Sequence, residues 1–590
     1  MMTPGSVLLH DTLDASGRSL YFAAPRGVLV AHEAAEAREA LTRLEAAGAE
    51  GLWAAGYLAY ELGYLFEERL AHLLPERSRT PLLWMGLYEA PQRLTRAEAD
   101  AALADAPDGR AVEIVPGLDF AAYERAFDRV KTYIADGDTY QVNLTFKARF
   151  RLEGDAVGLY RDLAKKQPTA YGALIHAGDH MVLSRSPELF VSNHEGVLSA
   201  RPMKGTLKRG RTLAEDEAGR KALAADEKNR AENLMIVDLL RNDLGRIAEI
   251  GSVRVSDLFT VETYRTLHTM TSGITARMQP GTSLGTVLAN LFPCGSITGA
   301  PKLRAMEIID EVEAGPRGLY TGAIGFIAPH GDFTFNVAIR TAVIDKKGDG
   351  EIGIGGGIVA DSRARDEYDE ALLKMQFFTD PPRPIALIET ILWTRSEGFS
   401  LLARHLDRMA ESARYFGLDF DRDAAEAVLD AAAQDFGDTP MRVRLLFEEG
   451  KDASVTATVL PPNPTEFKVM IAPERVESQN PLLAHKTTNR TFLDEPRIRA
   501  HEAEGVDEVI FVNEHGELTE GSITSLFIAR DGMLLTPPLS AGLLPGTLRA
   551  ELIAAGKARE QRLYPADLDG ARIFLGNSVR GLIPGRLIKP

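Results

Sequence analysis

Residues 380–384 read Asp-Pro-Pro-Arg-Pro, and this stretch decides how the 590-residue chain is organised. Three prolines in four residues remove backbone donors and prevent a helix, so the stretch predicts an extended connector. A chain of this length is also too long for one hydrophobic core. We therefore predict one domain at residues 1–380, a proline-rich linker at 381–385 and a second domain at 386–590.

Both sides of the connector mix helical and strand-like patterns. Before it, the expected helices are 31–50, 97–107, 121–135 and 226–248, and the expected strands are 181–184, 322–328 and 335–344. After it, the expected helices are 402–416 and 422–434, and the expected strands are 441–447, 454–460, 467–472 and 508–513. In the first part these elements do not follow a regular βαβ succession, which predicts the α+β class.

Composition excludes some functions. A formal net charge of −17 disfavours nucleic acid as a partner, because a nucleic-acid binder needs a basic surface. The start of the chain lacks the pattern of a secretory signal and no apolar run reaches the length of a membrane span, so we expect a cytoplasmic protein without a membrane partner. A single cysteine, Cys294, excludes an intramolecular disulfide.

The stretch Arg201-Pro202-Met203-Lys204-Gly205-Thr206 lies between expected strands. A lysine beside a glycine there suits a side chain that projects from a tight turn. Read alone, the same pattern is most often a solvated turn.

A run of glycines, Gly353-Ile354-Gly355-Gly356-Gly357-Ile358, precedes an acidic helical segment. Successive glycines let backbone N–H groups converge on an anion such as a carboxylate. In the segment that follows, Glu367 and Glu370 lie three residues apart on one helix face, and Lys374 lies one turn further. Two like charges so close favour a hard cation such as Mg²⁺ between them. A solvated acidic helix face explains the segment equally well.

Together these segments resemble the chorismate-utilising enzyme family. The resemblance also includes Phe292-Pro293-Cys294-Gly295-Ser296-Ile297-Thr298-Gly299-Ala300-Pro301-Lys302, Arg317-Gly318-Leu319-Tyr320-Thr321-Gly322, and Ala338-Ile339-Arg340-Thr341. It covers a catalytic core at residues 115–378, with a weaker similarity near 56–61 in an N-terminal lobe at 1–110. It implies two large antiparallel sheets with outer helices.

The resemblance also implies roles for individual residues. Glu232 and Glu370 are expected to hold Mg²⁺ against the ring carboxylate of chorismate, with Glu367 nearby. The substrate carboxylates are expected to contact Thr298, Tyr320, Arg340, the backbone of Gly355, and Lys374, while His268 orients substrate or packs. An arginine fork and a lysine point charge suit a dianion.

Two positions discriminate within the family. Anthranilate synthases carry an alanine where this chain has Lys204, whereas aminodeoxychorismate synthases carry a lysine that is proposed to attack the ring. Glu188 matches the general acid that protonates the departing hydroxyl. Gln141 stands where the relatives that add water carry a lysine base, which argues against water as the nucleophile.

The sole cysteine also bears on the source of nitrogen. Cys294 belongs to the chorismate loop, at a position where the family usually has glycine, and a glutamine amidotransferase needs a cysteine nucleophile of its own. We therefore expect ammonia from solution or from a separate glutamine amidotransferase subunit.

The second domain resembles the fold-type IV pyridoxal-phosphate family, which has a smaller α/β fold. The resemblance rests on Arg404-His405-Leu406-Asp407-Arg408, His485-Lys486-Thr487, Glu517-Leu518-Thr519-Glu520-Gly521-Ser522, Leu544-Pro545-Gly546-Thr547 and Gly576-Asn577-Ser578. It implies that Lys486 is the Schiff-base lysine, that Glu520 keeps the pyridine nitrogen protonated, and that Arg408 and the Thr547 turn hold the phosphate. The chain departs from the family by starting directly at Ile388-Glu389-Thr390, without a preceding strand pair, and by Ser525 in place of a common asparagine.

The resulting hypothesis is a bifunctional enzyme. It would aminate chorismate to 4-amino-4-deoxychorismate and then eliminate pyruvate to give 4-aminobenzoate, with Mg²⁺ and pyridoxal 5′-phosphate as cofactors. One alternative is an anthranilate synthase fused to an unrelated aminotransferase, and another is a second domain that only docks the glutaminase. We also consider a homodimer formed through the second domain.

Overall fold

The structure is a computed structural model, and it describes residues 2–265, 267–379 and 385–588. The chain divides into two compact units, of which the first comprises Met1–Lys208 and Lys221–Pro382, and the second comprises Arg209–Arg220 and Arg383–Pro590. Residues 381–384 of the expected linker lie outside the described residues, so the boundary placed there stays a prediction.

Two large sheets make up most of the first unit in the described residues. One has the strand order β18 (Gly299–Ala300), β8 (Gln141–Gly154), β22 (Asp349–Ile358), β21 (Thr341–Asp345), β10 (His180–Ser186), β9 (Tyr171–His176), β1 (Ser6–His10), β2 (Ser19–Phe22) and β6 (Gln92–Leu94), and β7 (Gly109–Pro116) also pairs with β8. The other has the order β14 (Arg254–Val255), β17 (Ile274–Arg277), β12 (Val197–Arg201), β11 (Leu189–His194), β20 (Phe333–Val337), β19 (Ala323–Ile327), β4 (Trp53–Leu58), β5 (Leu83–Tyr88) and β3 (Gly27–Ala31). The segment before residue 110 therefore contributes strands to both sheets.

A smaller sheet and several helices complete the first unit. The small sheet has the order β13 (Met203–Lys208), β16 (Leu267–Thr271) and β15 (Thr260–Thr263). The expected helices at 31–50, 97–107, 121–135 and 226–248 are confirmed as α1 (Ala34–Ala49), α2 (Arg96–Ala104), α3 (Phe120–Ala135) and α6 (Glu227–Gly245).

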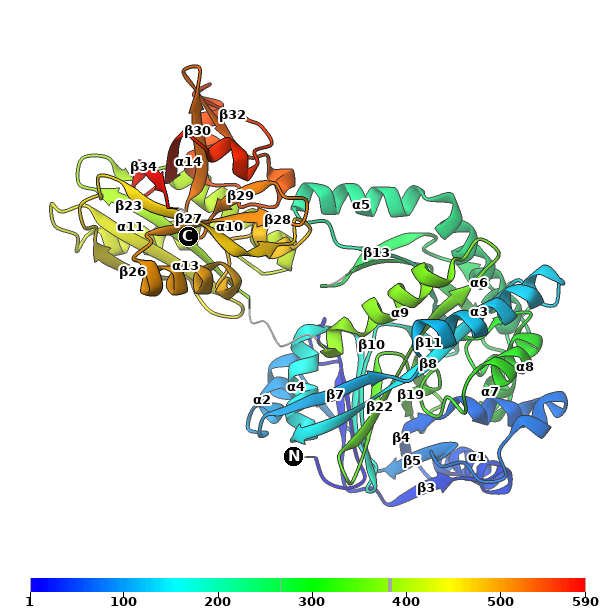
Figure 1. Ribbon diagram of the computed structural model, residues 1–590. Helices are drawn as coiled ribbons and strands as arrows, with labels where there is room; N and C mark the ends of the chain where they lie inside the picture. The colour runs from blue at the N-terminus through cyan, green and yellow to red at the C-terminus, as the bar shows by residue number, and fades with distance from the viewer. Residues whose placement is uncertain (1, 266, 380–384, 589–590) are drawn as a thin grey trace. The chain divides into compact units, whose positions relative to one another are not determined.

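Helix α9 (Ala364–Thr379) lies beside α3 on the sheet at β8 and β22 (Figure 1). Its apolar residues recur at helical spacing, and Tyr368, Met375 and Phe378 are buried. Tyr368 stacks on Phe146 of β8 with 5.7 Å between the ring centroids. Each buried aromatic or methionine side chain contributes about 1.5–3 kcal/mol, so this face holds the helix in place. The polar face of α9 thereby presents Glu367 and Glu370 at a fixed position.

One expected strand is wrong. The stretch 335–344 is not a single strand, because it forms β20 and β21, which belong to different sheets. Between them Arg340 takes a left-handed backbone conformation with φ 51°. The apolar pattern of this stretch contains neither glycine nor proline, so the sequence carries no signal for the break.

The second unit has its own sheets. In the described residues a four-stranded sheet has the order β24 (Gly398–Phe399), β23 (Ala386–Thr394), β25 (Met441–Glu448) and β26 (Ser454–Val459). An eight-stranded sheet has the order β29 (Leu518–Gly521), β28 (Glu508–Asn513), β27 (Phe467–Val476), β34 (Gly581–Leu587), β33 (Arg572–Asn577), β30 (Ser525–Arg530), β31 (Met533–Thr536) and β32 (Ala558–Glu560). Helices α10 (Leu402–Phe416) and α11 (Arg422–Ala433) match the expected pair. The predicted α+β class is confirmed, because helices and mixed sheets occur in both units.

The segment Arg209–Arg220 is part of the second unit although it lies within the range expected for the first domain. Arg209 forms a buried ion pair with Asp216 at 2.7 Å, and its guanidinium lies 4.4 Å from the centre of the Tyr415 ring. The Tyr415 hydroxyl donates to the Gly210 carbonyl at 2.7 Å. These contacts fix the segment on α10.

Candidate active sites

A cavity of about 340 Å³ in the first unit gathers most of the residues singled out by the sequence. Its size suits a small organic ligand. The expected site residues that line it are Glu188, Lys204, Glu232, Tyr320, Arg340, Gly355, Glu367, Glu370 and Lys374. Segments more than 150 residues apart in the chain therefore meet at one place.

Lys204 projects from β13 at an irregularity in the strand. The pairing of β13 with β16 shifts register between Lys204 and Thr206, and Gly205 between them has φ 84°. This is a glycine-containing β-bulge rather than the expected tight turn, and the bulge re-aims the lysine side chain. A β-carbon on Gly205 would lie 2.8 Å from Oδ1 of Asn229, so the position needs glycine. Burial, and next the charge of Lys374, lowers the pKa of Lys204, which favours its uncharged amine.

Glu188 lies immediately before β11 and is 3% exposed. Its Oε1 accepts a hydrogen bond from the Ser296 hydroxyl at 2.6 Å. Burial raises the pKa of Glu188 to about 7. The side chain is therefore a carboxylic acid that can give up a proton near neutral pH.

Arg340 is a half-buried cation with an unused donor. Its Nη1 is buried and has no hydrogen-bond partner, and burial lowers the pKa of the guanidinium to about 10. A guanidinium remains charged at neutral pH, so this donor suits an anionic ligand. Tyr320 lies behind the glycine strand, where a β-carbon on Gly353 would lie 2.1 Å from the tyrosine ring.

The glycines at 353–358 form part of strand β22, which pairs with β8 over its whole length. Their N–H groups therefore lie along an extended strand, and the expected convergence of successive N–H groups on an anion stays a prediction. The Gly355 carbonyl accepts from Nζ of Lys374 at 3.1 Å. Since the N–H and C=O of one residue in an antiparallel strand point to the same side, the Gly355 N–H also faces Lys374.

Three carboxylates share the cavity, and each has a protein partner; that of Glu232 is Lys228, at 3.9 Å. Glu370 pairs with Lys374 at 2.8 Å, and Glu367 accepts from Ser362 at 2.6 Å. Burial, together with the charge of Glu370, raises the pKa values of Glu232 and Glu367. Within the described residues no three His, Cys, Asp or Glu side chains are close enough to hold a metal as they stand. Oxygen donors that repel one another fit a hard divalent cation, which would require the three side chains to close in.

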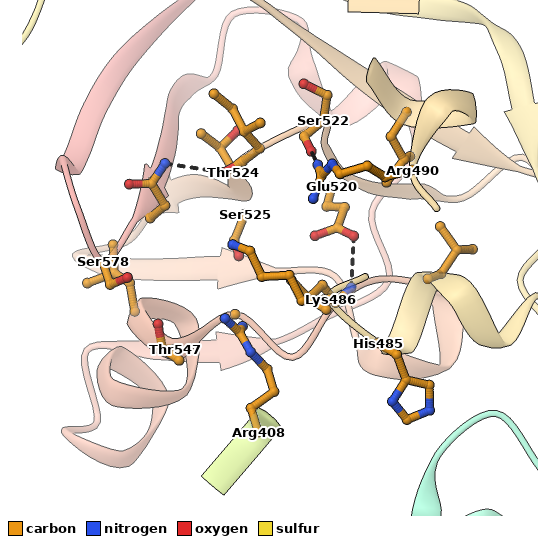
Figure 2. Close-up of a pocket in the computed structure, with 18 of the residues that line it drawn as sticks. Arg408, His485, Lys486, Arg490, Glu520, Ser522, Thr524, Ser525, Thr547 and Ser578 are labelled. Carbon is orange, nitrogen blue, oxygen red and sulfur yellow. Dashed lines mark hydrogen bonds between the residues drawn. The ribbon is translucent and has the colours of Figure 1, made fainter. Parts of the chain in front are cut away.

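A second pocket lies in the second unit, and it contains Arg408, Lys486, Glu520 and Thr547 (Figure 2). Burial, and next the charge of Arg408, lowers the pKa of Lys486 to about 8. Burial raises the pKa of Glu520 to about 8, and its Oε1 accepts from the backbone N–H of Leu544 at 2.8 Å. The hydroxyls of Thr547 and Ser578 and the guanidinium of Arg408 point into this pocket, as a phosphate group requires.

Two family models match the chain, one before and one after residues 381–385. The model for chorismate binding enzymes matches residues 13–380. The chain belongs to the chorismate binding enzyme family. The model for class IV amino-transferases matches residues 386–588. Both resemblances inferred from the sequence are thereby confirmed.

Individual relatives of this chorismate binding protein carry two names. Aminodeoxychorismate synthase of Streptomyces griseus is 41% identical over 327 residues, which cover 52% of this chain and 45% of the relative. Anthranilate synthase component 1 of Pseudomonas aeruginosa is 38% identical over 331 residues, which cover 56% and 63%. The solved anthranilate synthase component I of Streptococcus pneumoniae has a TM-score of 0.50 at 25% identity, and the match covers 64% of this chain and 90% of that one. The chain thus spans less than two thirds of each of these two curated relatives.

Two expected substrate contacts are not among the residues that line the first cavity. Thr298 is fully buried, and its hydroxyl donates to the carbonyls of Cys294 and Gly295, each at 3.2 Å. His268 is fully buried, and its Nδ1 lies 3.0 Å from the Thr263 hydroxyl. Their neighbours Ile297, Leu267 and Thr269 do line it. Contact of Thr298 and His268 with substrate stays a prediction.

Arg317 lies within one of the family motifs, but sequence reasoning assigns it no role. It is 3% exposed, and its guanidinium donates to the carbonyls of Ile297 at 2.8 Å and Asn143 at 2.6 Å, and to Glu313 at 2.7 Å. One buried cation therefore connects the backbone at Ile297 to strand β8. A lone arginine in a glycine-rich turn gives no signal for this.

Glu389 is a second residue that sequence reasoning missed. It is 1% exposed on β23, and it accepts from Arg408 at 2.6 and 2.8 Å and contacts Nδ1 of His405 at 2.6 Å. Burial acts to raise the pKa of Glu389, but Arg408 and His405 outweigh it and lower the value to about 2. On the other side of the His405 ring, Nε2 lies 2.9 Å from the Ser578 hydroxyl. The sequence signal that could have indicated this role is a glutamate between Ile388 and Ile391 in an otherwise apolar strand.

Among the residues the structure describes, no helix is both long and apolar enough to span a membrane.

Proposed function

We propose that this chain makes 4-aminobenzoate in two steps. The first unit aminates chorismate to 4-amino-4-deoxychorismate, and the second eliminates pyruvate from that product. The observation that carries the proposal is the pairing of Lys204, whose pKa is lowered, with Glu188, whose pKa is raised to about 7, on one cavity. A neutral amine and a neutral acid are the two groups that a lysine-mediated substitution needs.

Binding in the first unit follows from the cations of the cavity. The free Nη1 of Arg340 and the ammonium of Lys374 are suited to the two carboxylates of chorismate. Mg²⁺ would be held by Glu232, Glu367 and Glu370. It would offset the negative charge of these three side chains and bind one carboxylate of the substrate.

The chemistry then follows from the paired groups. The Lys204 amine forms a bond to the ring as the C–O bond to the ring hydroxyl breaks, and Glu188 gives its proton to that oxygen, which leaves as water. Ammonia next forms the new C–N bond while the bond to Lys204 breaks with its electron pair returning to the lysine. The ammonium that results returns a proton to the Glu188 carboxylate. Atoms and charge balance over the cycle.

In the second unit, pyridoxal 5′-phosphate would supply an electron sink for pyruvate loss. The residues fit this group, since the pocket combines a half-buried lysine, a buried glutamate and an arginine with hydroxyls. Arg408 and Thr547 would hold the phosphate, Glu520 would face the ring nitrogen, and Lys486 would anchor the cofactor and move the proton.

Ammonia would come from solution or from a separate glutaminase. The only cysteine, Cys294, is buried, and burial raises the pKa of its thiol to about 12. Such a thiol is a poor nucleophile.

The testing experiment supplies the purified chain with chorismate, ammonium chloride, Mg²⁺ and pyridoxal phosphate and identifies the products by chromatography and fluorescence. We expect 4-aminobenzoate and pyruvate in equal amounts. Formation of anthranilate would instead show that the first unit acts as an anthranilate synthase. Accumulation of 4-amino-4-deoxychorismate without 4-aminobenzoate would leave the second unit as a docking module.

A further inference from the structure

Three residues form a short hydrogen-bonded row at the proposed acid of the first cavity. The Ser296 hydroxyl donates to Oε1 of Glu188 at 2.6 Å, and Oγ of Ser296 lies 3.1 Å from Sγ of Cys294. Each of the three residues is 3% exposed. Glu188 and Ser296 both line the cavity, so the row ends where substrate would be held.

The chemistry of the three groups fixes the direction of the hydrogen bonds. The Ser296 hydroxyl has one proton, and a carboxyl oxygen is a better acceptor for it than the sulfur of a thiol. That proton therefore goes to Glu188, which leaves the thiol of Cys294 to donate to Oγ of Ser296. Since Oε1 of Glu188 already accepts from a hydroxyl, the proton of its neutral form belongs on Oε2.

We infer that Ser296 is a positioning residue for Glu188, because it keeps the proton of the acid on the oxygen that is left for substrate. The inference rests on the proposed function and adds the group that orients its acid. Without the Ser296 hydroxyl, either oxygen of the carboxyl group can hold the proton, and a proton on Oε1 is not available to the departing ring hydroxyl. Ser296 itself gains and loses no proton during the reaction.

The same hydrogen bond should also make the acid easier to deprotonate. Burial raises the pKa of Glu188 to about 7. The Ser296 hydroxyl acts on this pKa in the opposite direction, followed by the charge of Lys204 and the backbone N–H of Met203. A donor to the carboxylate stabilises the form that remains once the proton has been given away. Loss of the hydroxyl should therefore raise the pKa of Glu188 further.

Two other titratable groups act on this carboxyl group. Lys204 on β13 lines the same cavity, and burial, followed by the charge of Lys374, lowers the pKa of its amine. Burial raises the pKa of the Cys294 thiol to about 12, so the thiol is uncharged near neutral pH. Neither group is removed when Ser296 is replaced, so a change in the pH dependence of the reaction can be assigned to the hydrogen bond.

The test compares Ser296→Ala with the unchanged full-length chain. Consumption of chorismate is measured against pH at constant NH₃ concentration with Mg²⁺ present, and the products are identified separately. In Ser296→Ala the pH at which kcat/KM declines should rise by about one unit, the shift expected for loss of one hydrogen bond to a carboxylate. The rate on the plateau below that decline should fall about tenfold, because the acidic proton is no longer held on one oxygen.

Two further variants separate the hydrogen bond from the shape of the loop. Ser296→Cys keeps a side chain of similar size but has a weak donor, so its decline should move in the same direction as in Ser296→Ala. Cys294→Ala is the matched control, because it shortens an equally buried side chain of the same loop and keeps the hydrogen bond from Ser296 to Glu188. Its decline should stay within about 0.3 pH units of that of the unchanged chain, since a thiol is a weak donor.

Each outcome decides one question. A decline that stays near pH 7 in both Ser296 variants would overturn the positioning role. An equal shift in Cys294→Ala would also overturn it, because the packing of the loop rather than the hydrogen bond would then set the pKa of Glu188. If the unchanged chain consumes chorismate without forming a 4-amino product, the proposed function fails, while the shift between the variants still tests the action of Ser296 on Glu188.

Discussion

The two pockets contain the same pair of groups in different surroundings. Each has a half-buried lysine whose pKa is lowered and a buried glutamate whose pKa is raised, Lys204 with Glu188 and Lys486 with Glu520. The first pair shares its cavity with three carboxylates and a partly unpaired arginine, whereas the second lies beside an arginine fixed by Glu389. In the proposed function, the neighbours rather than the pair itself decide whether the lysine reacts with substrate or anchors a cofactor.

Replacing each lysine by methionine should have the largest effect on activity, and a different step should be lost in each variant. Lys204→Met should lower amination about 10³-fold or more, because the nucleophile is gone, while supplied 4-amino-4-deoxychorismate is still converted. Lys486→Met should do the reverse and accumulate that intermediate. Product analysis of both variants checks this, and a variant that loses both activities with its fold intact would contradict the separation of roles.

Glu188→Gln should remove the acid and lower amination by about 10²–10⁴-fold. Glu188 must be protonated to act and the pKa is about 7, so kcat/KM should fall as pH rises through 7 in the unchanged chain, and that decline should vanish in the variant. Rates against pH at constant NH₃ concentration measure this. A decline that persists in the variant would show that another group titrates.

Arg340→Lys tests the arginine of the first cavity, which has a free donor, whereas Arg408 of the second pocket is held by Glu389. Nη1 of Arg340 has no protein partner, so we assign it to substrate. A lysine retains the charge but not the fork, so the KM for chorismate should rise about 10–100-fold with a smaller change in kcat. An unchanged KM would argue against this contact.

Glu389→Gln tests whether the ion pair with Glu389 holds Arg408 in position for the cofactor. With a neutral amide in place of the carboxylate, Arg408 and His405 lose their charge-assisted partner, and the Kd for pyridoxal phosphate should rise about tenfold. Absorbance titration measures the Kd, and amination serves as the internal reference that should not change. The exposed Glu397→Gln on the same unit is the matched control. An equal Kd for pyridoxal phosphate in the Glu389→Gln and Glu397→Gln variants would show that Glu389 does not support cofactor binding.

Sequence reasoning succeeded where local patterns are strong and failed where distant segments meet. Helices α3, α6 and α10 were found because their apolar residues repeat at helical spacing. The sequence did not predict the break between β20 and β21 at Arg340 or the β-bulge at Gly205. No breaker residue marks the kink, and a lysine next to a glycine is equally typical of an ordinary turn.

The site itself was found mainly through the family resemblance. Arg317 and Glu389 were missed because their roles arise only when strands from different parts of the chain surround them. A buried charge has no sequence signal beyond its presence in an apolar stretch.

The most direct measurement is mass spectrometry of the chain after incubation with chorismate and Mg²⁺ in the absence of ammonia. The account predicts a covalent adduct at Lys204 that disappears, with release of 4-amino-4-deoxychorismate, when ammonia is added. Unmodified Lys204 throughout, together with undiminished formation of the 4-amino product by Lys204→Ala at low ammonia, would contradict it.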